Sequence, residues 1–254
     1  MLPLATHGRY PETWITVSLF FLIFSLPAFY YLPSDRKNSV SVFSAAVKGG
    51  RYAFVTMNEM MKNRPLRRFM LAYFIYEDGV NTVIVFSSIF AALTLEFAAG
   101  ELILLYIIVQ ATALTGAFLM AKPIDAWGPK KVLLLSLLAW SFVSITAFFV
   151  ESKTYFLVLA SVAGLGLGTV QASSRAFFTQ FIPPAHESEY FGMYSLAGKS
   201  SAIMGPVLFG TVSSFFGSQR PAILAVSFFF LAGMIIVQRV HGGGPNIKSC
   251  DIRS

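Results

Sequence analysis

The sequence predicts an all-α membrane protein with seven transmembrane helices. Hydrophobic residues make up 56% of its 254 residues and charged residues only 12%, about half the charged fraction of a soluble domain. Its mean hydropathy is +0.67. The apolar residues form seven runs that can cross a hydrocarbon layer of about 30 Å, at 14–32, 69–95, 102–121, 132–150, 156–182, 190–216 and 221–238.

The basic residues predict the orientation of these spans. Of the 19 Lys and Arg residues, fourteen lie in the segment 33–68, in the loop after the third span or in the C-terminal tail, and three lie on the opposite side. Cytoplasmic loops are the ones enriched in Lys and Arg. We therefore expect the N-terminus outside and the C-terminus in the cytoplasm, and the net charge of +7 then requires no nucleic-acid partner.

The spans divide the chain into four regions. The first span stands apart within residues 1–32, and residues 33–66 form a basic cytoplasmic linker whose interspersed apolar residues predict a helix lying on the inner leaflet. Residues 67–240 form a six-helix bundle. Residues 241–254 are glycine-rich and polar, which predicts a disordered cytoplasmic tail. Residues 1–13 lack the basic region of a secretory signal, so the first span is expected to be an anchor.

The second span carries polar residues near its middle, namely Glu77, Asp78 and Asn81. A charge at the bilayer centre costs at least ~2.5 kcal/mol, so such residues face a partner or a water-filled cavity. At helical spacing, Glu77 and Asn81 share one face and Asp78 lies on its flank. The alternative is a carboxyl group that is protonated or ion-paired for packing alone.

The fifth span contains Gln171 and Arg175, and the sixth contains Lys199. Counted from the cytoplasmic ends, the two cations lie close to the depth of the two carboxylates, so we expect these charges to pair or to bracket a charged solute. The alternative for both cations is that they extend to the nearby interface. Small or rigid residues in the same spans predict close helix packing, at Gly164, Gly168, Gly205 and Pro206.

The loop AKPIDAWGPKK at 121–131 resembles the G-x-x-x-D-x-x-G-x-R/K signature of major facilitator superfamily transporters. Asp125, Gly128 and Lys130 match this signature, whereas Ala121 replaces its first glycine. Gly128 permits a tight turn, and Asp125 can accept from a helix N-terminus or a basic side chain. We expect the three matching residues to form a conformational latch.

Three further segments are similar to the C-terminal half of the autophagy-related protein 22-like family, with a leaning to its bacterial-type branch. They are YEDGVNT at 76–82, the run at 170–206 and GSQRP at 217–221. The resemblance implies that the seven spans are helices 6–12 of a twelve-helix major facilitator fold, so residues 1–32 hold the last helix of an N-terminal bundle. The family comprises fungal vacuolar effluxers for amino acids and bacterial relatives without an assigned substrate. The host membrane is accordingly a bacterial inner membrane or a vacuolar membrane.

The resemblance implies secondary active transport of a small polar solute by alternating access, with amino acids as candidate solutes. Glu77 or Asp78 is then the candidate for proton coupling, Arg175 and Lys199 are counter-charges or carboxylate ligands, and Gln171 and Asn81 bind solute. Because complete transporters of this type have about twelve helices, we expect either a fragment or gene remnant, or a half-transporter whose first half comes from a separate polypeptide or is replaced by a second copy. No cofactor or metal is expected, and Cys250, the single cysteine, excludes an internal disulfide.

Other classes remain as alternatives. A seven-pass receptor fits the topology, although the long linker at 33–66 and the transporter-like loop disfavour it, and a half-transporter remnant without activity is also compatible. A membrane-embedded enzyme is disfavoured because the three histidines lie outside the spans and no H-E-x-x-H or G-x-S-x-G sequence occurs.

Overall fold

The computed structural model describes residues 10–31 and 42–241, and the regular structure in these ranges is entirely helical. This confirms the predicted all-α class. The helices are α2 (Tyr10–Tyr31), α3 (Val42–Lys62), α4 (Arg64–Leu93), α5 (Ala99–Trp127), α6 (Pro129–Phe148), α7 (Lys153–Thr179), α8 (Glu187–Ser200), α9 (Met204–Phe216) and α10 (Gln219–Gln238).

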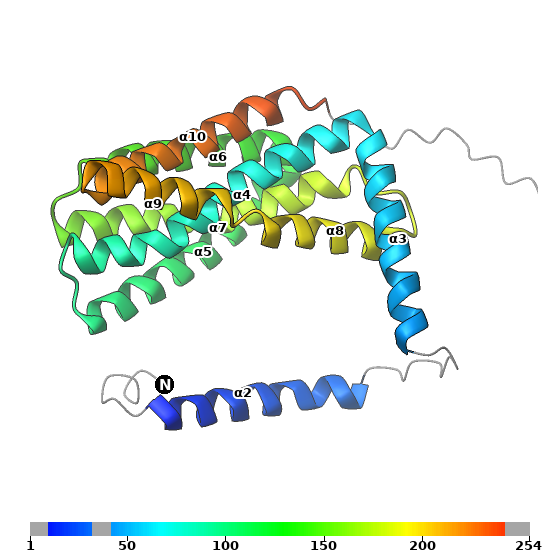
Figure 1. The fold of residues 1–254 in the computed structure, drawn as a ribbon, viewed down its shortest axis with the longest axis horizontal. Helices are drawn as coiled ribbons and strands as arrows, with labels where there is room; N and C mark the ends of the chain where they lie inside the picture. Colours follow the sequence, from blue (N-terminus) through cyan, green and yellow to red (C-terminus); the bar gives the residue numbers. More distant parts are fainter. Residues whose placement is uncertain (1–9, 32–41, 242–254) are drawn as a thin grey trace, which may run out of the picture.

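Helices α4–α10 pack into one bundle (Figure 1). Helix α5 lies along α7, α6 contacts both α7 and α10, and α10 also packs against α4 and α9. The core is built from large apolar side chains that are fully buried, among them Phe69, Leu137, Phe177 and Phe230. These residues come from four different helices, so α6 and α10 contribute to the centre of the bundle as well as to its surface.

Six helices in the described ranges are long and apolar enough to cross a membrane, namely α2, α4, α5, α6, α7 and α10. The predicted sixth span at 190–216 is instead two shorter helices, α8 and α9, interrupted at 201–203. Figure 1 shows them following one another along nearly one line. The expected count of seven uninterrupted spans is therefore not confirmed, because this span is broken near its centre.

Helix α3 runs across the end of the bundle at a steep angle to its helices (Figure 1). Thr56 and Met60 are buried, and the Thr56 hydroxyl donates to Glu189 of α8 at 3.2 Å. Tyr52 and Phe54 are exposed. This arrangement is compatible with the interfacial helix expected from the linker, although the linker residues 33–41 lie outside the described ranges.

Helix α2 lies apart from the bundle, and its described side chains are mostly exposed (Figure 1). An apolar helix with so much exposed surface requires lipid or a further protein surface around it. The predicted tail lies almost entirely outside the described residues, since only His241 of that segment is described.

Candidate solute site and helix break

A pocket of about 300 Å³ lies between α4, α7 and α8. Five of the six residues predicted to bind solute or protons line it, namely Glu77, Asn81, Gln171, Arg175 and Lys199. Its volume is at the lower end of the range for small-molecule sites. Helical spacing explains the α4 contribution, because Glu77 and Asn81 are four residues apart and therefore project from one face.

The three charges in this pocket have unequal surroundings. Glu77 is 8% exposed, and one of its carboxylate oxygens accepts from the Gln171 side-chain amide at 2.9 Å. Arg175 and Lys199 are exposed, and neither makes a hydrogen bond or ion pair with any described residue. Arg175 acts on Glu77 only through space. Of the two expected arrangements, direct pairing or the bracketing of a charged solute, no ion pair joins these charges among the described residues, and the bracketing of a solute stays a prediction.

Two tyrosines complete the wall of the pocket. The rings of Tyr73 and Tyr194 stack with their centroids 4.1 Å apart, and the Tyr194 hydroxyl donates to Ser174 at 3.0 Å. The sequence analysis did not single them out. Tyr73 precedes Glu77 by one helical turn, which was the available signal, but an aromatic residue in an apolar span is more often only a packing residue.

Asp78 does not line this pocket. It is 1% exposed, and one of its carboxylate oxygens accepts from the backbone N–H of Gly205, in the first turn of α9, at 2.8 Å. The amides of Met204 and Ile203 also face this carboxylate, although its second oxygen has no hydrogen bond of good geometry. Asp78 therefore supplies negative charge to the positive, N-terminal end of α9, and the expectation that both carboxylates share one chamber differs from the structure.

Asn81 contacts the other side of the same break, at the C-terminal end of α8. Its side-chain amide lies 3.4 Å from the carbonyl oxygen of Gly198, near the end of α8, and 3.4 Å from the hydroxyl of Ser201. A side-chain donor thus faces the carbonyl end of α8, while Asp78, an acceptor, faces the amide end of α9. We call Asp78 and Asn81 the α4 clamp. It supplies partners to backbone groups that a broken helix leaves unpaired in a low-dielectric setting.

A family model described as vacuole effluxer Atg22-like matches residues 10–242. The chain belongs to the Atg22-like family. The family predicted from the sequence motifs is thereby confirmed.

Named relatives of this Atg22-like chain come from bacteria and fungi. An uncharacterized MFS-type transporter, YxiO, of Bacillus subtilis is 30% identical over 78% of this chain and 45% of its own length. Autophagy-related protein 22 of Cryptococcus neoformans is 27% identical over 85% of this chain and 40% of its own. The Saccharomyces cerevisiae protein of that name is 28% identical over 72% and 37%. The chain thus spans less than half the length of these relatives.

Of the three predicted latch residues of the Atg22-like chain, Gly128 forms a turn and Lys130 makes hydrogen bonds, whereas Asp125 makes none with the described residues. Gly128 is the one-residue turn between α5 and α6, with a φ of 88° that favours glycine. The Lys130 ammonium donates to the backbone carbonyls of Gln238 at 2.9 Å and Val240 at 2.5 Å, at the C-terminal end of α10. Asp125 lies in the last turn of α5, is exposed, and contacts no described hydrogen-bond partner or cation, contrary to expectation.

Close helix approach occurs at three of the four predicted packing positions. An added Cβ at Gly164 would overlap Thr112, and one at Gly168 would overlap the carbonyl oxygen of Ala113, so α5 and α7 meet through bare backbone. An added Cβ at Gly205 would overlap the Thr82 hydroxyl of α4. Pro206, beside it, is half-buried in the first turn of α9, where proline needs no intrahelical donor.

Proposed function

We propose that this chain provides the C-terminal half of a secondary transporter that moves a small polar solute by alternating access. The observation that carries the proposal is the convergence of five polar or charged side chains from three helices on one pocket inside an apolar bundle. Intramembrane ionisable residues mark solute and ion pathways. The name of the Bacillus subtilis relative, an MFS-type transporter, supports the same proposal.

The charges of the pocket favour a solute with a carboxylate. Arg175 and Lys199 present two cations that have no hydrogen-bond or ion-pair partner among the described residues, and Glu77 is the single acidic residue of the lining. A zwitterion satisfies both signs when its carboxylate faces the cations and its ammonium group faces Glu77. Amino acids are the simplest such solutes, with Gln171 and Asn81 as additional hydrogen-bonding groups.

We further propose that the α4 clamp couples solute binding to a change in helix shape, with Asp78 as the proton acceptor. Protonation of Asp78 removes the charge that holds the first amides of α9, which frees α8 and α9 to change their relative angle. Asn81 connects this event to the solute, because it both lines the pocket and contacts the end of α8. Discontinuous helices at a midplane site are a recurring feature of secondary transporters.

The first experiment measures solute binding. The full chain is placed in lipid nanodiscs, and its thermal stability is measured with zwitterionic amino acids, organic anions and organic cations. We expect zwitterions or anions to raise the melting temperature, and Arg175→Gln to weaken their apparent affinity about tenfold, the effect of losing one charge-assisted hydrogen bond.

Lys122→Gln is the matched control, because Lys122 is exposed on α5 outside the pocket. Equal affinity in the Arg175 and Lys122 variants would contradict the proposed carboxylate site. Proton coupling is tested separately, by pH-driven uptake into liposomes that contain the chain together with its complementary half. Wild-type proton-coupled uptake by Asp78→Asn would exclude Asp78 as the proton acceptor.

A further inference from the structure

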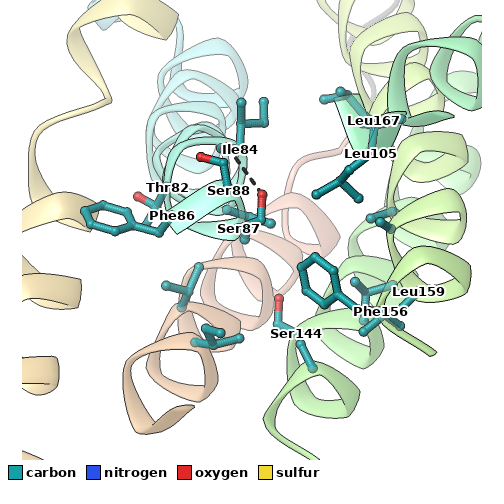
Figure 2. A pocket seen from close by; sticks show the side chains of 18 of the residues that line it. Thr82, Ile84, Phe86, Ser87, Ser88, Leu105, Ser144, Phe156, Leu159 and Leu167 are labelled. Atoms are coloured by element: carbon teal, nitrogen blue, oxygen red, sulfur yellow. Dashed lines mark hydrogen bonds between the residues drawn. The ribbon is translucent and has the colours of Figure 1, made fainter. Parts of the chain in front are cut away.

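A second cavity, of about 350 Å³, lies in the same helical bundle as the solute pocket (Figure 2). It sits between α4 on one side and α5 and α7 on the other, with α6 and α10 behind it, and it shares no lining residue with the solute pocket. Most of its wall is aliphatic or aromatic, as the labelled Leu105, Phe156, Leu159 and Leu167 illustrate (Figure 2). The lining contains no charged side chain.

A cavity of this size is expected to be filled by a ligand rather than to stay empty. Protein interiors are packed as densely as organic crystals and contain few voids larger than a water molecule. A buried water needs two to four polar partners, and apolar cavities tend to stay dry and to bind apolar molecules. The composition of this wall therefore favours a neutral, mostly apolar ligand over a cluster of water.

The deep wall carries a polar atom without a partner. Helix α6 has three buried serines, of which Ser136 donates to Gly166 on α7 and Ser141 donates to Leu137 one turn back. The third, Ser144, lines the cavity, is 2% exposed, and its hydroxyl has no partner among the described residues. Figure 2 shows this hydroxyl directed into the cavity, on the wall opposite Ser87.

One turn back on the same face of α6, Trp140 repeats the pattern. It also lines the cavity, is 2% exposed, and its indole N–H has no hydrogen-bond partner in the described ranges. Buried donors in native proteins are almost always satisfied. The indole nitrogen of Trp140, however, lies against Gly166 of α7, 3.0 Å from where a Cβ would stand. The Ser144 hydroxyl is therefore the unpartnered polar atom that indicates a ligand oxygen in the cavity.

The mouth of the cavity lies between α4 and α5. Ile84 and Tyr106 are 45% and 64% exposed, and the polar Ser88 and Gln110 are also exposed beside them. A ligand that enters here passes a wet or lipid-facing rim, crosses an apolar middle and reaches Ser144 at depth. Both ends of the path are polar and its centre is not.

We propose that this cavity is a binding site for a neutral hydrocarbon chain with one terminal hydroxyl group, of the size of a medium-chain alcohol. The chain fills the apolar middle, and the hydroxyl group exchanges a hydrogen bond with Ser144. The site is separate from the polar pocket and does not depend on the identity of the transported solute.

The test is photolabelling of the full chain in nanodiscs with 3-azioctanol, followed by peptide mapping. Labels are expected on the cavity faces of α4, α6 and α7, and excess octanol should compete for them. Ala147→Leu fills the cavity from α6 and should abolish these labels. Ala139→Leu is the matched control on the same helix, because Ala139 is exposed and does not line the cavity. Ala160→Leu on α7 repeats the test if the Ala147 variant does not fold.

Ser144→Ala tests the ligand class. It should weaken octanol competition about fivefold, the ratio that corresponds to one ordinary hydrogen bond, while leaving the labelling by an octane diazirine without a hydroxyl unchanged. Labels spread evenly over the lipid-facing surface, and unaffected by either filling variant, would overturn the site. An equal response of both probes to Ser144→Ala would overturn the requirement for a hydroxyl group.

Discussion

Glu77 and Asp78 are adjacent, yet they contact different parts of the bundle. Successive residues of a helix project about 100° apart, so Glu77 faces Gln171 in the polar pocket while Asp78 faces the first turn of α9. Both carboxylates lie at the same depth in the bundle. Only their different neighbours place Glu77 in the solute pocket and Asp78 at the helix break. The tight contact at Gly205 makes the position of Asp78 at the helix break testable.

We predict that Gly205→Ala destabilises the bundle by about 1–3 kcal/mol, the usual cost of overpacking. The new methyl group would overlap the Thr82 hydroxyl and crowd Asp78, which pushes the start of α9 away from the clamp. Thermal unfolding in detergent measures the loss, and amide hydrogen exchange at 203–206 should become faster.

Two companion variants make this prediction specific. Gly210→Ala lies on the same helix with nothing within 4 Å of an added Cβ, so it should be neutral or slightly stabilising. Adding Thr82→Ala to Gly205→Ala removes the overlapping hydroxyl and should restore part of the stability. A Gly205 variant as stable as the Gly210 variant would argue against a tight junction.

At the scale of elements, side chains from other helices satisfy the helix ends inside the bundle. The α4 clamp contacts both sides of the α8–α9 break, and Lys130 from the start of α6 contacts the carbonyl end of α10. A lysine at a helix C-terminus complements the helix dipole as well as donating hydrogen bonds. Lys130 of the transporter-type loop thus connects α6 with α10, the last described helix of the chain.

Lys130→Met should lower the free energy of unfolding by about 1 kcal/mol, because two carbonyls lose a charged donor. The same change at Lys131 is the control, since Lys131 is the next residue, is exposed, and makes no hydrogen bond with the described residues. Chemical unfolding of the two variants, monitored side by side, measures the difference. Equal stability would mean that the Lys130 contacts contribute nothing to the native state.

At the scale of the whole molecule, the described residues leave both polar and apolar surface exposed. The pocket has exposed cations, the described side chains of α2 are mostly exposed, and the chain covers less than half of each named relative. We therefore propose that the faces around the pocket meet a complementary transporter bundle.

The predicted orientation can be tested with single cysteines. In a Cys250→Ser background, a membrane-impermeant maleimide applied to intact cells should label Glu151→Cys, between α6 and α7, and leave Lys131→Cys unlabelled. The reason is that the basic residues concentrate on the side of Lys131. Both positions are exposed, so permeabilised cells should show labelling of both. The reverse pattern in intact cells would invert the proposed topology.

The sequence by itself determined the helical class, the spans that are polar, and the family. Hydropathy, charge and short motifs are properties of local stretches, so the polar positions Glu77, Gln171 and Arg175 could be predicted to meet from their depth and helical faces. The tertiary structure alone decided that Asp78 turns to α9, that the sixth span breaks at 201–203, and that Asp125 makes no hydrogen bond or ion pair within 10–31 and 42–241. These outcomes depend on which backbone ends lie beside a side chain after packing, and residue spacing within one helix does not specify that.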